Sequence, residues 1–252
     1  MAVEILRRVF PVGAAVVFAA ACSILPSEPP PPIRLGAAPA NPAGPRYEGA
    51  SVHSSGFYEF DQWPKACNLV ADADIRAVFP QVTDIEKVAS DTNLMLLSPL
   101  EAWEPSHTVR VGGARCAVAM ALPGITFDAA EFPPRAGAEV MVEVLAAGSA
   151  GAVYRNRPEP SRDNPVVTIA GVPCVGAGGN GLVCATLYVV FEVSVTAEYT
   201  RQVDEFTAIR YLHGGETVAW ARESATDELR RQREWERSVI VTELVEAIVA
   251  KL

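Results

Sequence analysis

The chain has 252 residues, of which 50% are hydrophobic, and its 30 acidic and 21 basic residues give a formal net charge of −9 at pH 7. This length and composition allow one domain with a substantial hydrophobic core. Nucleic acid is excluded as an expected partner, because its phosphates attract clustered Lys and Arg, whereas the densest basic stretch, residues 230–233, is flanked by acidic side chains.

The N-terminus is typical of an exported lipoprotein. Arg7 and Arg8 precede an apolar run, residues 9–21, which ends in three alanines directly before Cys22. A positive segment, a short apolar segment and a small-residue cleavage site are the parts of a secretory signal peptide. The run has about 13 residues, whereas a transmembrane helix needs roughly 20. The pattern predicts a signal peptide over residues 1–21 and a diacylglycerol on the Cys22 thiol, with an ordinary cleaved signal as the alternative.

Such a lipid would place the protein at the extracytoplasmic face of the cell membrane. Two acyl chains, buried at about 0.8 kcal/mol per CH₂, hold a chain stably without a protein span. The other long apolar run, Leu182–Val195, is interrupted by Glu192 and Ser194. The expected partners are therefore the membrane, through the N-terminal lipid, and an unidentified small ligand or envelope protein.

Residues 22–56 are predicted to be a linker. They contain the run Pro29–Pro32 and many Ala and Gly residues. Proline keeps such a segment extended, and small side chains supply little apolar surface to pack. We expect this linker to hold a single folded domain, residues 57–252, away from the bilayer.

The folded region is predicted to begin with a short helix over residues 67–79. Asp72 is suited to be its N-cap, and Pro80 stops it. The alternative is that Asp72 and Asp74 form a pair of metal ligands. We prefer a cap and a first-turn acid, because the helix dipole favours negative charge at this end.

Strands are predicted where apolar residues alternate with polar ones. The clearest case is residues 187–198, in which Phe191, Val193 and Val195 share one face. The other predicted strands are Arg115–Ala121, Glu139–Leu145 and Val166–Ala170. Residues 224–252 lack Gly and Pro and have apolar residues at helical spacing, which predicts an amphipathic helix packed on the sheet. The expected fold class is α+β, a mostly antiparallel sheet flanked by helices, with a long C-terminal helix.

Four cysteines besides Cys22 indicate two disulfides in an exported chain. Three pairings are open. Cys174 and Cys184 flank a glycine-rich turn and are close in sequence, so we pair them, which leaves Cys67 with Cys116. Zinc is disfavoured because the chain has no C-x₂-C spacing and no histidine beside a cysteine. No metal ion and no cofactor is expected.

Motifs for chemistry are weak. Residues 176–181 match G-x-G-x-x-G, but a strand-like segment follows, whereas a dinucleotide site needs a helix there, so we expect a flexible hairpin tip. His53, His107 and His213 have no nucleophile motif near them. An envelope hydrolase that uses a histidine or a carboxylate pair, such as Glu101 and Glu104, is the alternative function.

The residues around two of the cysteines resemble those of a known family. A helix start at Cys67–Ala71, a strand cysteine at Cys116 and a Val/Gly turn at residues 167–172 follow the linker in order. In these features the chain resembles uncharacterised actinobacterial envelope lipoproteins that share a two-cysteine domain of unknown function. The resemblance implies a Cys67–Cys116 bridge and an α+β domain similar to PsbP-like folds. It supplies no catalytic residue, and we expect a non-enzymatic, lipid-anchored module that binds a ligand or a protein.

Overall fold

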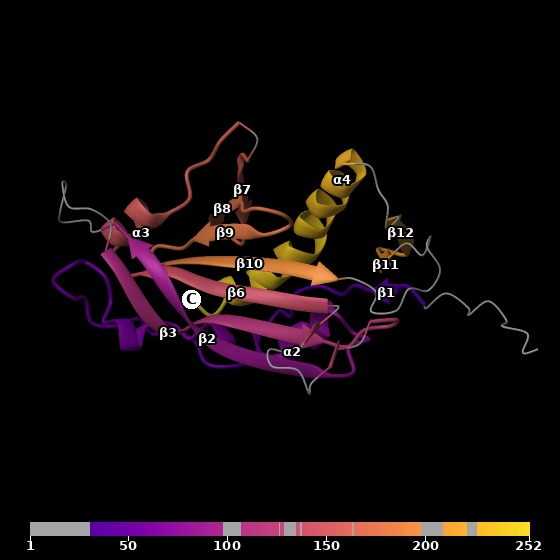
Figure 1. Cartoon of the computed structure of the whole chain (residues 1–252), viewed down its shortest axis with the longest axis horizontal. Helices are drawn as coiled ribbons and strands as arrows, with labels where there is room; N and C mark the ends of the chain where they lie inside the picture. Colours follow the sequence, from indigo (N-terminus) through magenta and orange to yellow (C-terminus); the bar gives the residue numbers. More distant parts are fainter. Residues whose placement is uncertain are drawn as a thin grey trace, which may run out of the picture.

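The computed structural model describes residues 31–97, 107–125, 127–128, 135–136, 138–162, 164–197, 209–220 and 226–252. The fold is α+β, as predicted, and is built around a large antiparallel sheet (Figure 1). Cys22 and the predicted signal peptide lie outside the described residues, as does the predicted carboxylate pair of Glu101 and Glu104.

The main sheet has seven strands in the order β2-β3-β6-β10-β9-β8-β7, and each neighbouring pair is antiparallel. Its strands are β2 (Ile85–Leu96), β3 (His107–Met120), β6 (Ala138–Ala147), β7 (Val166–Ile169), β8 (Val172–Gly176), β9 (Leu182–Ala185) and β10 (Val189–Ala197). The strands β4 (Phe127–Asp128) and β5 (Arg135–Ala136) pair antiparallel in a separate two-stranded sheet.

The central strands confirm the predicted alternation. Val140, Val142 and Val144 of β6 are fully buried and alternate with half-buried residues. In β10, Phe191 and Val193 are buried in the same way. This alternation arises because one face of the sheet packs on the core and the other does not. The four predicted strands therefore correspond to β3, β6, β7 and β10, although β3 is longer than predicted.

Short helices pack beside the main sheet, and one of them carries Cys67. They are η1 (Phe60–Gln62), α1 (Ala66–Leu69) and α2 (Asp72–Val78), while α3 (Ala150–Asn156) follows β6. The single helix predicted over residues 67–79 is therefore wrong, because the chain breaks at Val70 and Ala71. Asp72 is also not the N-cap; Ala71 takes that position, and the side chain of Asp74 accepts the hydrogen bond of its N–H.

The C-terminal helix forms as predicted, with one interruption. It consists of α4 (Thr226–Glu236), the π-helical turn η2 (Arg237–Val241) and α5 (Thr242–Val249). Figure 1 shows α4, in yellow, rising away from the sheet. The apolar residues Leu244, Val245 and Ile248 of α5 are buried in the core, as the helical spacing predicted.

Residues 33–47 pack on the domain as an N-terminal strap. Ile33 is fully buried, and β1 (Ile33–Arg34) pairs in parallel with β11 (Ile209–His213) in a second sheet that includes β12 (Glu216–Trp220). The backbone N–H of Gly36 donates to the carbonyl of Val78, and that of Tyr47 donates to the carbonyl of Lys251. The prediction of a free linker over residues 22–56 is therefore wrong from Ile33 onward.

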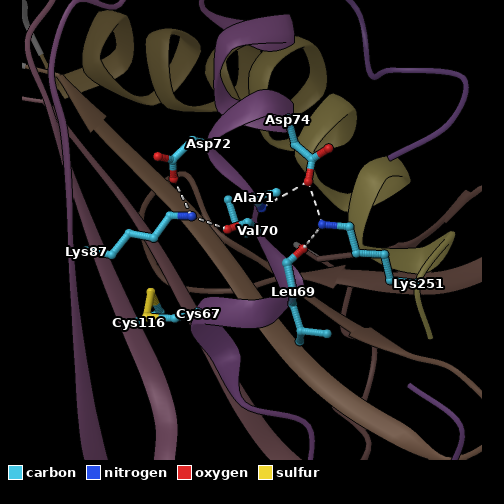
Figure 2. A network of polar contacts seen from close by, with 9 residues as sticks. All are labelled: Cys67, Leu69, Val70, Ala71, Asp72, Asp74, Lys87, Cys116 and Lys251. Carbon is cyan, nitrogen blue, oxygen red and sulfur yellow. Dashed lines mark hydrogen bonds and ion pairs between the residues drawn. A yellow bond between two sulfur atoms is a disulfide. The ribbon is translucent and has the colours of Figure 1, made fainter. Parts of the chain in front are cut away.

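A buried ion pair joins the strap, α2 and the C-terminus. The Nζ of Lys251 lies 2.5 Å from Oδ2 of Asp74, and both side chains are 1% exposed. Asp74 also accepts hydrogen bonds from the backbone N–H groups of Ala43 and Ala71, and Lys251 donates to the carbonyl of Leu69. Figure 2 shows this pair on one side of residues 69–71, with the pair of Lys87 and Asp72 on the other side. Asp72 and Asp74 thus bind separate lysines and do not form a metal pair.

Both predicted disulfides are present. The helix–strand disulfide joins Cys67 of α1 to Cys116 of β3, with a sequence separation of 49 (Figure 2). The hairpin disulfide joins Cys174 of β8 to Cys184 of β9, which lie directly opposite each other in the register. The first disulfide thus links the sheet to a helix, and the second links two neighbouring strands.

Candidate functional site

A cleft opens between the β7–β8 edge of the main sheet and the C-terminal helix. Its volume is about 370 Å³, which falls within the range of sites for small ligands. We call it the hairpin–helix cleft. It is lined by Asn164, Pro165, Val167, Thr168, Ile169, Gly176, Leu182, Glu234, Arg237, Ser238 and Thr242. Apolar side chains therefore come from the strands, and most of the polar ones come from the helix.

The π-helical turn forms the helix side of the cleft. Within η2 the backbone N–H of Thr242 donates to the carbonyl of Arg237, five residues earlier, and the hydroxyl of Thr242 donates to the same carbonyl. A π turn inserts one residue into a helix and is frequent at functional sites. The insertion changes the helical phase between α4 and α5, so that Arg237 borders the cleft while α5 still buries its apolar face.

Arg237 is held against the glycine-rich turn between β8 and β9. Its Nη2 donates to the carbonyl of Gly179 at 3.0 Å. A Cβ atom on Gly176 would overlap the Nη1 of Arg237 and would lie 2.8 Å from the Oδ1 of Asn164. A side chain at Gly176 would therefore displace the ends of the Arg237 and Asn164 side chains.

The two charged residues that line the cleft, Glu234 and Arg237, are not paired with each other. Glu234 is paired with Arg230, with 2.8 Å between the carboxylate and the guanidinium group. Arg237 has no carboxylate partner among the described residues, and its Nε is buried without a hydrogen bond there. The helix side of the cleft therefore carries one guanidinium charge without a counter-ion from the described part of the chain.

The glycine-rich turn is anchored to the body of the domain. Asn180 is buried, and its side chain donates to the carbonyl of Val195 and to Glu236. Glu236 is buried as well and also accepts hydrogen bonds from the hydroxyl of Tyr211 and the amide of Gln232. The sequence predicted a hairpin tip here, and strands do flank it, but this network ties the tip to α4. No helix follows residues 176–181, so the turn lacks the geometry of a dinucleotide site.

The predicted histidines do not come together in the described residues. His53 lies on an exposed loop beside Ser55. His213 ends β11, where its ring meets Trp235 edge-on. His107 begins β3, and its side chain lies outside the described residues. No group of three or more His, Cys, Asp or Glu side chains suited to a metal occurs in the described part of the chain.

One carboxylate on the open face of the sheet has a perturbed pKa. Burial, together with the negative charge of Glu143 on the neighbouring strand, raises the pKa of Glu192, while Arg115 opposes the shift. Glu143 lies directly opposite Glu192 in the register and accepts a hydrogen bond from Thr92. These residues form a row across the open face, away from the hairpin–helix cleft.

Sequence analysis did not identify Arg237 or Asn164 as site residues. Each is an ordinary polar residue in its local segment, and only the folded structure brings both to Gly176. The four disulfide cysteines were identified, but their role is structural, and the hairpin disulfide lies two residues from Gly176 and from Leu182 along β8 and β9.

No family model, no curated protein and no solved structure matches the chain. In the described residues no helix is long and apolar enough to cross a bilayer.

Proposed function

We propose that the chain is a lipid-anchored, extracytoplasmic binding module of the cell envelope that holds a small ligand in the hairpin–helix cleft. The observation that carries the proposal is a cavity of about 370 Å³ with apolar walls and a guanidinium group that has no counter-ion among the described residues. Apolar walls with a few placed polar groups are typical of small-molecule sites.

The envelope location is proposed on the N-terminal sequence, in which Arg7, Arg8 and a short apolar run lead to Cys22. Two disulfides are consistent with this location, because such bonds persist in oxidising compartments. Kinship with the actinobacterial lipoproteins of the two-cysteine type is proposed on the residue pattern around Cys67 and Cys116 alone.

Native mass spectrometry of the protein exported by its own host tests the proposal. A reproducible adduct on the gently purified protein is expected, and its mass would give the chemical class of the ligand. Thr168→Trp should abolish the adduct, because Thr168 lines the cleft. Val166→Trp is the matched control, since it lies on the same strand, is 48% exposed and does not line the cleft. An adduct that survives Thr168→Trp, or that both variants remove, would contradict binding in the cleft.

A further inference from the structure

We propose that the ligand of the hairpin–helix cleft is an amphiphilic monocarboxylate, a molecule with one carboxylate head and an aliphatic tail. This inference rests on the proposed binding function and assigns a ligand class to that site. It is carried by the charge of Arg237 on the helix side of the cleft, unpaired among the described residues, by its free Nη1 beside Gly176 and by the apolar walls.

The charge balance favours a monoanion. Glu234 is paired with Arg230, which lies outside the lining, so Arg237 is the lining charge that has no partner among the described residues. A carboxylate carries one negative charge and matches it, whereas a phosphate monoester carries about −1.5 to −2 at pH 7. A dianion would place excess negative charge beside Glu234.

The guanidinium group of Arg237 suits a carboxylate head. The Nη1 of Arg237 makes no hydrogen bond to the described residues, and the side chain of Asn164 makes none either. Both groups approach Gly176, Arg237 with its donor Nη1 and Asn164 with its acceptor Oδ1, so the donor for a carboxylate is Arg237. A planar guanidinium group pairs with a carboxylate through parallel N–H bonds.

The walls suit an aliphatic tail. Leu182 is 2% exposed and Ile169 is 6% exposed, so this part of the lining belongs to the core. Val167, by contrast, is 44% exposed, which leaves apolar surface for a ligand to cover. Each CH₂ buried in such a site contributes about 0.8 kcal/mol, which is about four-fold in affinity.

The test is isothermal titration calorimetry at pH 7 with hexanoate, octanoate, octan-1-ol and octyl phosphate. It uses the exported, disulfide-bonded full chain with Cys22→Ala, so that no acyl chain or detergent competes for the cleft. Octanoate should bind about 10- to 100-fold more tightly than octan-1-ol, the range for a hydrogen bond to a charged group. Hexanoate, which lacks two CH₂ groups, should bind about 16-fold more weakly than octanoate.

Variants assign the effect to Arg237. Arg237→Gln should reduce octanoate affinity to that of octan-1-ol, Arg237→Lys should retain part of the preference, and Gly176→Ala should weaken binding by displacing the guanidinium group. Arg233→Gln is the matched control, because Arg233 is an exposed arginine of the same helix outside the lining. Circular dichroism and the mass of the oxidised chain show whether each variant is folded.

The outcomes separate this inference from the proposed function. Octanoate and octan-1-ol binding equally, with Thr168→Trp blocking both, would overturn carboxylate recognition and leave a ligand-binding cleft. Tighter binding of octyl phosphate than of octanoate would overturn the monoanion assignment. Failure of all four compounds to bind, with no adduct on the native protein, would overturn both proposals.

Discussion

Replacement of Lys251 by Met should destabilise the domain far more than the same replacement at Lys87. Lys251 and Asp74 are both 1% exposed and lie 2.5 Å apart, so Lys251→Met leaves a carboxylate buried without its counter-ion. Removal of one partner of a buried pair typically costs 3–5 kcal/mol. Two backbone N–H groups still hold Asp74 after the change, so we expect the lower end, about 3 kcal/mol.

Lys87→Met is the matched control. Lys87 lies 2.5 Å from Asp72 and also donates to a backbone carbonyl, that of Val70, but the two charged side chains are 23% and 57% exposed. Exposed ion pairs contribute about 0–1 kcal/mol, so Lys87→Met should cost about 1 kcal/mol. The two lysines flank the same segment in Figure 2 and differ mainly in burial.

The assay is urea unfolding of the oxidised protein at pH 7, followed by tryptophan fluorescence, with the free energy of unfolding taken by linear extrapolation. The double variant Asp74→Asn/Lys251→Met should recover at least about 1 kcal/mol relative to the sum of the single variants, because it leaves no buried charge. Equal losses for Lys251→Met and Lys87→Met, or strict additivity in the double variant, would refute the argument from burial.

Three further predictions concern the anchor, the disulfides and the sheet. Cys22→Ala should release the protein from membranes, measured by fractionation after high-salt and carbonate washing; retention in the membrane fraction would contradict the anchor. Replacement of both cysteines of one disulfide by Ser should lower the free energy of unfolding by about 4 kcal/mol for the helix–strand disulfide and by about 3 kcal/mol for the hairpin disulfide. The first loss is larger because the entropy of loop closure grows with the sequence separation, which is 49 residues in one and 10 in the other. Urea unfolding that gives the reverse order would contradict this. Because the pKa of Glu192 is raised in the folded state, that state binds more protons and loses stability as pH rises from the ordinary glutamate range through the raised value. Glu192→Gln should therefore raise the free energy of unfolding by about 0.5 kcal/mol at pH 7, the size of one cross-strand charge pair, and should leave it unchanged below the ordinary glutamate pKa. A stabilisation that persists in acid would show another cause.

The sequence predicted the strands and helices in which the apolar residues of one face all enter the core. Alternation in β10 identified the strand because its apolar residues all enter the core, as Phe191 and Val193 do. Strand β2 was missed, since it lies at the edge of the sheet and the first half of the strand buries no residue fully. The strap was predicted to be part of a linker because it is rich in proline and alanine. A few buried residues, above all the fully buried Ile33, nevertheless hold it on the domain.

The candidate site was beyond sequence analysis for a different reason. The sequence predicted the hairpin and the helix that form the cleft, but it carried no sign that Arg237 would meet Gly176. That contact depends on the phase of the C-terminal helix, which the π turn changes. A local pattern predicts which residues a helix buries, whereas a one-residue shift of phase is decided by packing between distant segments.

The docking of β1 on the domain fixes the length of the segment that would separate the domain from a lipid on Cys22. If Cys22 carries the proposed lipid, the leash between the acylated residue and Ile33 spans 11 residues, at most about 35 Å when fully extended. A leash of this length confines the domain to a thin shell above the bilayer, where two tethered sites have a mutual effective concentration in the millimolar range. At such a concentration even weak affinity for an envelope component would keep the domain occupied, so a change in leash length should alter occupancy without any change at the binding surface.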